Sequence, residues 1–208
     1  MSFWAEWATV AVVGLLAVAS PGPNQAMTIR NSLSSRRAGV MTAVGVALGN
    51  AVHAFYCILG IAVVVAQSIT LFSLLKYAGA GYLIYVGIRS LLVRRRAGIA
   101  EAAPPKPIGA AAALRSGLLT DVLNPKVTLF FLALFTQVIR PDTPVAAQVV
   151  YGATMVALEF LWCAALAFVI GHRSVRARFE RVGHWIERAM GGVLVALGLR
   201  LAFARGSG

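Results

Sequence analysis

Two helix-breaking motifs each interrupt a hydrophobic segment that is long enough to cross a lipid bilayer. The first consists of Ser20, Pro21, Gly22, Pro23 and Asn24, and the second of Asn124, Pro125 and Lys126. Proline lacks a backbone N–H and its ring clashes with the preceding turn, so it disrupts a helix. In the hydrocarbon core, the polar groups that it frees must face protein, water or a ligand. The two interruptions therefore predict two broken transmembrane helices around a transport site.

The composition is that of a multi-pass membrane protein. Of the 208 residues, 59% are hydrophobic and only 12% are charged, whereas soluble domains carry about 25% charged residues. Long apolar segments span residues 3–33, 38–66, 72–92, 117–139, 145–171 and 185–204. Each is compatible with the roughly 20 residues that a helix needs to cross the hydrocarbon core. We therefore predict an all-α membrane protein with six transmembrane helices, of which the first and fourth are broken.

The basic residues are distributed unevenly between the predicted connections. One side of the membrane receives eleven of them: Arg36, Arg37, Arg94, Arg95, Arg96, Lys106, Arg115, Arg173, Arg176, Arg178 and Arg181. The other side receives only Lys76, Arg140 and Arg205. Cytoplasmic connections accumulate Lys and Arg, so both termini are predicted on the non-cytoplasmic side. Residues 179–189 suit a basic interfacial helix that leads into the last crossing.

The net charge of +12 fits contacts with anionic lipid headgroups, because the basic residues lie in short connections between apolar segments. Membrane lipids are therefore expected as partners, and no nucleic-acid partner is expected.

Two segments of similar sequence indicate an internal repeat. Residues 78–89 and 189–200 are identical at five positions at a constant offset. Each half of the chain contains three predicted crossings, an odd number, so the second half must be inverted relative to the first. We predict a first three-helix repeat at residues 1–96, a cytoplasmic linker rich in Ala and Pro at 97–114, and a second three-helix repeat at 115–208. Together they form one membrane domain.

Each predicted break brings helix ends of both polarities near the middle of the bilayer. At 1.5 Å per residue, Asn124 lies about 13 Å and Pro21 about 18 Å from the cytoplasmic ends of their segments. A helix that restarts at Pro125, with Asn124 as its N-cap, directs free amides toward the centre, and the preceding helix end presents carbonyls. We expect the same around Ser20 and Pro21. Amides suit a carboxylate and carbonyls suit an ammonium, so the pattern favours a zwitterionic amino acid as the ligand.

A series of spaced motifs runs through nearly the full chain. It comprises residues 20–24, Gly49 with Asn50, residues 76–83, residues 123–126, and Phe130 with Phe131. In this order the motifs resemble the LysE/RhtB family of bacterial amino-acid exporters. The resemblance implies a multi-pass transporter of the bacterial inner membrane that exports amino acids or close derivatives, with the proton gradient as its energy source.

Two positions depart from the pattern of that family. Asp121 stands where a neutral Asn is common, and Thr136 with Gln137 replaces a frequent Pro-Gln pair. The first departure leaves open which substrate charge the protein prefers.

The predicted substrate-binding residues are the two break motifs together with Asn50 and Asp121. Asp121 lies inside the membrane, one helical turn before the second break, and is interpreted as a contact for the substrate ammonium. It could instead cap backbone groups or neutralise Lys126. Lys126 could bind the substrate carboxylate or serve as the structural partner of Asp121.

Three residues are candidates for proton coupling: Glu159, Asp121 and His53. Glu159 is the strongest, because a carboxyl near the centre of the fifth predicted helix can take up and release a proton. A static hydrogen bond to a neighbouring helix is its alternative role. His53 lies one helical turn after Asn50 and could relay protons, although a lone helical histidine is more often a packing residue.

Other function classes fit the sequence less well. No enzyme activity and no cofactor are expected, because the sequence lacks a soluble catalytic domain, a phosphate-binding loop and a His/Cys cluster with metal-binding spacing. An ion or metal-cation exporter on the same architecture is the main alternative, although Lys126 opposes a cation. Cys57 and Cys163 would suit a transmembrane thiol relay, but neither adjoins a break. A passive channel would need a continuous polar lining, and homo-oligomerisation stays open.

Overall fold

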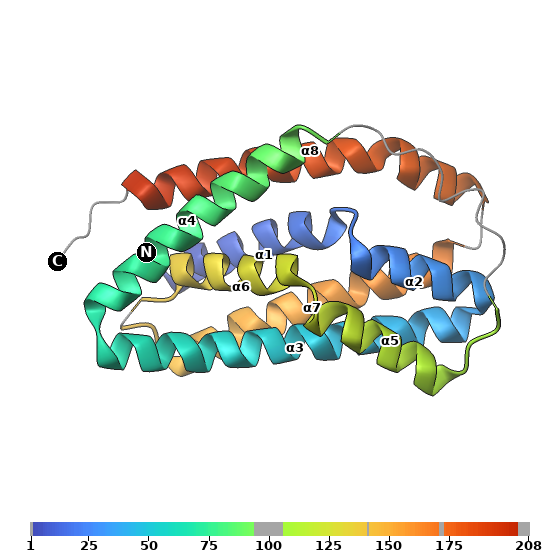
Figure 1. Ribbon diagram of the computed structural model, residues 1–208, viewed down its shortest axis with the longest axis horizontal. Helices are drawn as coiled ribbons and strands as arrows, with labels where there is room; N and C mark the ends of the chain where they lie inside the picture. Colours follow the sequence, from blue (N-terminus) through green and yellow to red (C-terminus); the bar gives the residue numbers. More distant parts are fainter. Residues whose placement is uncertain (1, 94–105, 141, 171–172, 204–208) are drawn as a thin grey trace.

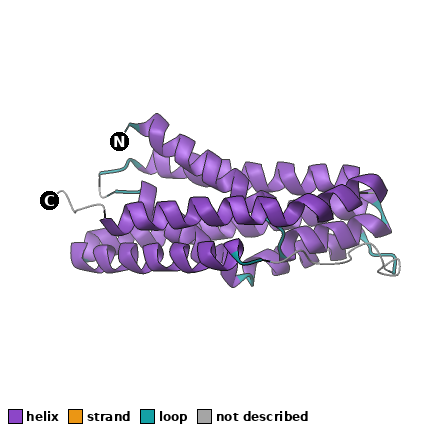
Figure 2. Ribbon diagram, turned by 90° about the horizontal axis from the view of Figure 1, so that it is seen from above, coloured by secondary structure: helices purple, strands orange, loops and turns teal. Residues whose placement is uncertain are grey.

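The computed structural model describes residues 2–93, 106–140, 142–170 and 173–203. Within these residues the chain is helical, with no strand. The helices are α1 (Phe3–Ala19), α2 (Pro23–Ser34), α3 (Arg36–Gln67), α4 (Ile69–Leu91), α5 (Ala110–Val122), α6 (Pro125–Val138), α7 (Val145–Val169) and α8 (Arg173–Phe203). They form an elongated bundle in which α1 begins and α8 ends at the same end (Figure 1). Seen from above, long helices run side by side (Figure 2).

Each of the six predicted spans corresponds to one helix or to one bent pair of helices. The first is α1 with α2, bent by 54°, and the fourth is α5 with α6, bent by 56°. Within the described residues, α3 (as Arg36–Ile61) and α7 are long and apolar enough to cross a membrane. Each bent pair of helices is also long and apolar enough if the pair is taken as one span. That makes up to four spans. Six crossings need α4 and α8 as well, so the six-helix inverted repeat stays a prediction.

One helix boundary, the start of α5, differs from the sequence expectation. Helix α5 begins at Ala110, inside the segment predicted as a linker, because the alanines at its start favour helix. Helix α8 is continuous from Arg173 to Phe203, so the basic stretch at 179–189 runs into the last segment without an interruption. Residues 94–105, which include the first half of the predicted linker (97–105), lie outside the described residues.

Glycines allow two pairs of helices to pack in close backbone contact. Where α3 meets α5, a Cβ on Gly45 would collide with the carbonyl oxygen of Leu114. Where α4 meets α8, a Cβ on Gly87 would lie 2.7 Å from the Gly191 carbonyl oxygen, and one on Gly198 would lie 2.8 Å from that of Ala80. Small residues permit such approach between helices in membranes. The two similar segments, 78–89 and 189–200, thus lie side by side and run in opposite directions.

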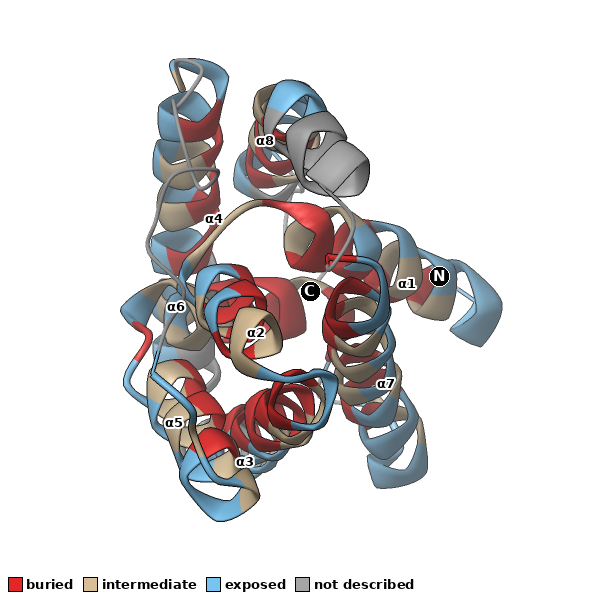
Figure 3. Cartoon of the chain, turned by 90° about the vertical axis from the view of Figure 1, so that its right-hand side faces the viewer, coloured by how far each residue is buried: buried red, intermediate tan, exposed pale blue. Residues whose placement is uncertain are grey.

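Apolar side chains fill the interior and also cover much of the exterior. The main buried cluster includes Phe131, Phe135 and Tyr151. Large apolar side chains such as Phe55 and Leu161 are exposed on the outside, and buried residues face the middle of the bundle (Figure 3). Since soluble proteins rarely expose large apolar areas, this exterior is typical of a surface that faces lipid.

Candidate functional site

The two breaks lie next to each other near the middle of the bundle (Figure 1). A direct contact joins them, because Lys126 Nζ at the start of α6 donates to Ser20 Oγ at the end of α1 over 3.4 Å. The structure therefore brings together the two motifs that the sequence singled out, although they are about 100 positions apart.

The second break has the expected helix start. Pro125 is the first residue of α6, and the Asn124 side chain accepts a hydrogen bond from the Lys126 amide at 3.1 Å. Proline at the first helical position loses no helical hydrogen bond, and an Asn N-cap satisfies one of the free amides.

The first break differs in detail from the expectation. Helix α2 restarts at Pro23 instead of Pro21, with Gly22 as an N-cap that has no side chain to offer. The preceding helix end is partly satisfied by protein, because Gln25 Nε2 donates to the Val18 carbonyl oxygen at 2.5 Å. The N-terminal amides of α2 thus start beside the pocket without a side-chain cap.

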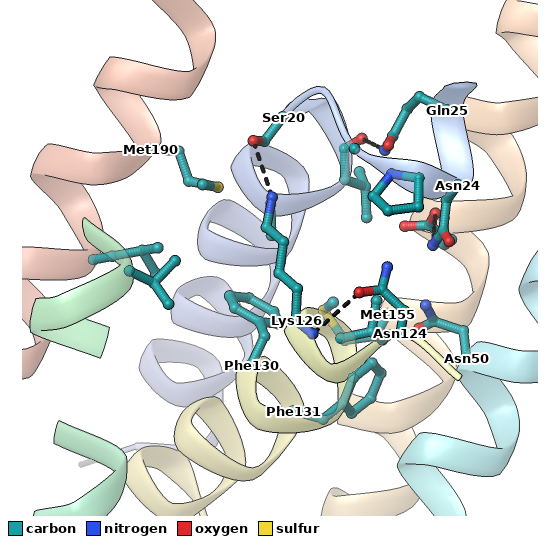
Figure 4. A pocket seen from close by; sticks show the side chains of 18 of the residues that line it. Ser20, Asn24, Gln25, Asn50, Asn124, Lys126, Phe130, Phe131, Met155 and Met190 are labelled. Carbon is teal, nitrogen blue, oxygen red and sulfur yellow. Dashed lines mark hydrogen bonds between the residues drawn. The ribbon is translucent and has the colours of Figure 1, made fainter. Parts of the chain in front are cut away.

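A pocket with a free volume of about 50 Å³ lies between the breaks (Figure 4). Its polar lining includes Ser20, Asn24, Gln25, Asn50, Asn124, Lys126 and Glu159, and Gly22 and Pro23 also line it. Its apolar lining includes Leu83, Val86, Phe130, Phe131, Met155, Met190 and Leu194. Among the described residues predicted for the site, Pro21, His53, Asp121 and Pro125 are not part of this lining. Most of the predicted substrate-binding residues therefore surround one cavity.

Asn24 joins the two buried carboxyls. Its Nδ2 donates to Asp121 Oδ1 at 2.6 Å and to Glu159 Oε1 at 3.1 Å. The three side chains come from α2, α5 and α7, and each is almost completely buried. The sequence predicted roles for all three residues but did not predict that they meet.

Three buried oxygens at this centre have no hydrogen-bond partner within the described residues: Asn24 Oδ1, Asn50 Oδ1 and Asp121 Oδ2. Buried polar atoms are nearly always hydrogen-bonded to protein, water or a ligand. Amide and ionised carboxylate oxygens only accept hydrogen bonds. These three oxygens therefore suit a hydrogen-bond donor such as an ammonium group, and the carboxylate oxygen can also bind a proton.

His53 lies behind Asp121. Its Nε2 is 3.0 Å from the Asp121 carbonyl oxygen and 3.5 Å from Asp121 Oδ2. Its Nδ1 contacts the Tyr56 hydroxyl, and its ring stacks on Phe131 with centroids 5.9 Å apart. His53 is thus both packed and in contact with a carboxyl, so its position is compatible with either of the roles proposed from the sequence.

Several pocket residues were not predicted from the sequence. Gln25 has a local signal, since it directly follows the first break. Met155, Met190 and Leu194 have none, because ordinary apolar residues in α7 and α8 reveal their orientation only once the helices are packed.

The two cysteines are free and buried. Cys163 Sγ lies 3.6 Å from Glu159 Oε1 and packs with Ala43 and Val46, whereas Cys57 belongs to the larger apolar cluster. Across the described ranges, no group of three or more His, Cys, Asp or Glu side chains could hold a metal ion.

Known proteins resemble this chain along almost its whole length. The profile of the LysE type translocator family matches residues 15–205. The uncharacterized membrane protein YahN of Escherichia coli (strain K12) is 32% identical over 92% of this chain and 87% of its own. The threonine efflux protein of the same strain is 25% identical over 95% of this chain and 97% of its own. No solved structure matches the chain.

Proposed function

Because the chain belongs to the LysE translocator family, we propose that it is a secondary transporter of the bacterial inner membrane that exports amino acids or close derivatives. The similarity to threonine efflux proteins of Escherichia coli and Salmonella typhi supports an amino acid as the transported solute. The observation that carries the proposal is the pocket between the breaks, which combines a lysine ammonium with buried acceptor oxygens.

The two charged groups of an amino acid bind at different parts of this pocket. The carboxylate binds at Lys126 Nζ and the uncapped N-terminus of α2, since helix N-termini favour anions. The ammonium binds at the amide oxygens of Asn24 and Asn50, beside Glu159. A zwitterion satisfies both sets of groups at once.

The protein crosses the membrane six times as two inverted repeats, residues 1–96 and 115–208, joined by a cytoplasmic linker. Helix α1 packs on α7, and α3 packs on α5. In the two repeats α1 corresponds to α5 and α3 corresponds to α7, so these two contacts are equivalent. The α3–α7 and α4–α8 pairs each join a helix to its counterpart in the other repeat, and the two helices of each pair are antiparallel. This pattern supports a two-fold relation within the membrane plane. The basic connections then face the cytoplasm and both termini face away from it.

Transport proceeds by alternating access, with the two repeats rocking around the pocket. Asp121 and Glu159, bridged by Asn24, carry the coupling proton, and His53 exchanges it with Asp121. Two carboxylates close together in a low-dielectric interior repel each other. A proton held by the pair is therefore released when the substrate ammonium arrives and is taken up again when it leaves.

A cation exporter is the second candidate, favoured by the three orphan oxygens near Asp121. Lys126 lines the same cavity and repels a cation, so the first function is the better supported.

Efflux from proteoliposomes separates the two functions. Vesicles containing the purified protein are loaded either with labelled amino acids or with labelled Na⁺ and K⁺, and a proton gradient of either sign is imposed. Saturable amino-acid efflux that is faster when protons can enter in exchange is expected. Lys126→Met should slow this efflux about tenfold or more, whereas Lys106→Met, an exposed lysine, should not. Cation flux without amino-acid flux would overturn the proposal.

A further inference from the structure

A chain of contacts leads from Asp121 to a tyrosine outside the pocket. His53 Nε2 is 3.0 Å from the Asp121 carbonyl oxygen and 3.5 Å from Asp121 Oδ2. The other ring nitrogen, Nδ1, contacts the hydroxyl of Tyr56, which lies three positions further along α3. Among the described residues that line the pocket, neither His53 nor Tyr56 is found. Their contact therefore has no part in enclosing the substrate.

The Asp121 carbonyl oxygen determines which ring nitrogen of His53 carries hydrogen. A carbonyl oxygen only accepts hydrogen bonds, so Nε2 must be a donor. In a neutral imidazole the other nitrogen is then an acceptor, and a phenolic hydroxyl can donate to it. The Tyr56 hydroxyl therefore donates to Nδ1 of the neutral ring, and the Nε2 hydrogen faces Asp121.

The same hydroxyl also suits the ring during proton exchange with Asp121. When His53 holds the coupling proton, both ring nitrogens carry hydrogen, and Nε2 can give its proton to Asp121 Oδ2. An N–H bond breaks, an O–H bond forms, and the two opposite charges disappear. The ring is left with hydrogen on Nδ1, and the Tyr56 hydroxyl can turn to accept from it. A phenyl ring at position 56 can neither donate nor accept, so it would leave the buried Nδ1 unpaired.

On the basis of the proposed function, we propose that Tyr56 is a positioning residue for proton coupling. Its hydroxyl holds the His53 ring with the Nε2 hydrogen directed at Asp121, and it keeps Nδ1 hydrogen-bonded in each protonation state. Tyr56 acts only through His53 and does not touch the substrate.

NMR of the purified protein tests the hydrogen positions without any transport. The ring nitrogens of isotope-labelled histidine are observed at a pH at which the His53 ring is neutral, and the His53→Phe variant identifies its signals. Nε2 should carry the hydrogen, and Nδ1 should show the shift of a hydrogen-bonded acceptor. In Tyr56→Phe, the Nδ1 signal should move to the position of an unbonded nitrogen. Hydrogen on Nδ1 of the neutral ring, or an Nδ1 signal that Tyr56→Phe leaves unchanged, would overturn the inference.

Transport in proteoliposomes tests whether the positioned ring matters for coupling. Tyr56→Phe should lower proton-driven efflux about tenfold or more relative to amino-acid exchange without a gradient, because exchange needs no net proton transfer. Tyr77→Phe, at a position 51% exposed on α4, is the matched control and should keep the wild-type ratio. Equal loss of efflux and exchange in Tyr56→Phe would overturn the positioning role.

A double variant tests whether Tyr56 acts through His53. His53→Phe keeps an aromatic ring to stack on Phe131 but has no ring nitrogen. Adding Tyr56→Phe to this variant should therefore lower the ratio of efflux to exchange no further, and a further loss would contradict the proposal. Wild-type efflux that ignores the gradient would overturn the coupling role, whereas absence of any amino-acid transport would overturn the proposed function. The NMR experiment decides the hydrogen positions in either case.

Discussion

A single asparagine holds the two intramembrane carboxyls in one unit. Asn24 has two N–H groups on its side chain, and the structure directs its nitrogen at Asp121 and Glu159 together. An amide can satisfy two carboxyls without adding charge, whereas a lysine would neutralise one of them and an aspartate would repel both. An asparagine therefore suits the pair of acids to which we assign the coupling proton.

Replacing Asn24 by Leu should uncouple export from the proton gradient. Both carboxyls lose a donor, which costs about 1–3 kcal/mol for each group left unsatisfied, and they no longer act as a pair. We expect export to fall about tenfold and to become insensitive to the imposed gradient in proteoliposomes.

Asn31→Leu is the control for that substitution. Asn31 is equally buried and donates to Thr42 Oγ1 at 2.9 Å and to Ser116 Oγ at 3.0 Å, away from the two carboxyls. It should cost a similar amount of stability but leave gradient sensitivity unchanged. The same response of export in both variants would show that Asn24 is merely structural.

Gly49 provides the space that Asp121 occupies. A Cβ added at Gly49 would lie 2.7 Å from Asp121 Oδ2, which is too close for unbonded atoms, so Gly49→Ala must displace the carboxyl from Asn24. We expect a strong reduction of efflux with normal membrane insertion. Gly60→Ala, in the same helix with no atom within 4 Å of the added Cβ, should retain wild-type efflux. A fully active Gly49→Ala would show that the position of Asp121 does not matter.

At the level of helices, a side-chain cap stabilises the second break. Asn124 caps α6 and so sets the direction in which Lys126 and Phe130 leave the break. Asn124→Ala should lower the free energy of unfolding by about 1 kcal/mol and reduce efflux, because the first turn of α6 loses its anchor. Asn124→Asp keeps an acceptor at the cap and should recover the lost stability. Thermal unfolding in detergent measures the first effect, and an alanine variant with unchanged efflux would show that the cap has no part in binding.

The buried Glu6 carboxylate connects α1 to α7 and to the exposed Arg140 in the loop between α6 and α7. Glu6 accepts a hydrogen bond from the Tyr151 hydroxyl at 2.9 Å and pairs with Arg140 at 3.1 Å. Glu6→Ala leaves the buried Tyr151 hydroxyl without this partner and should cost about 1–3 kcal/mol of stability.

Arg140 also pairs with Asp142, and this second pair provides the control. Asp142 is 79% exposed, and exposed ion pairs contribute little to stability. Asp142→Ala should therefore leave thermal unfolding unchanged. Equal melting temperatures for Glu6→Ala and Asp142→Ala would contradict a role for Glu6 in holding this end of the bundle together.

Across the whole molecule, features that depend on neighbouring residues, such as the helix breaks, could be predicted from the sequence. Contacts between segments far apart in the chain could not. Proline and glycine act on their own turns, so the positions of both breaks followed from the sequence. The restart at Pro23 instead of Pro21 did not, because either proline can begin a helix and the surrounding packing decides. The early start of α5 was missed because an alanine-rich stretch next to prolines was interpreted as linker.

The site itself could be predicted only in part. Asp121 and Glu159 were candidates because each is acidic within an apolar segment, and Asn24 was a candidate because it belongs to the first break motif. Their meeting depends on the packing of α2, α5 and α7, and the partners of Asn24 are 97 and 135 positions away in the chain. The apolar pocket residues of α8 carried no signal, because Met190 and Leu194 cannot be told from lipid-facing residues until the helices are assembled.

In our proposal, the pocket between the two breaks recognises both charged groups of an amino acid. Equilibrium binding of labelled valine, N-acetylvaline and valine amide to the purified protein tests it most directly. Free valine should bind saturably, and each blocked derivative should bind about tenfold or more weakly, because it leaves buried polar groups of the site unpaired. Equal binding of the three compounds, or no saturable binding of valine or any other free amino acid, would contradict the claim.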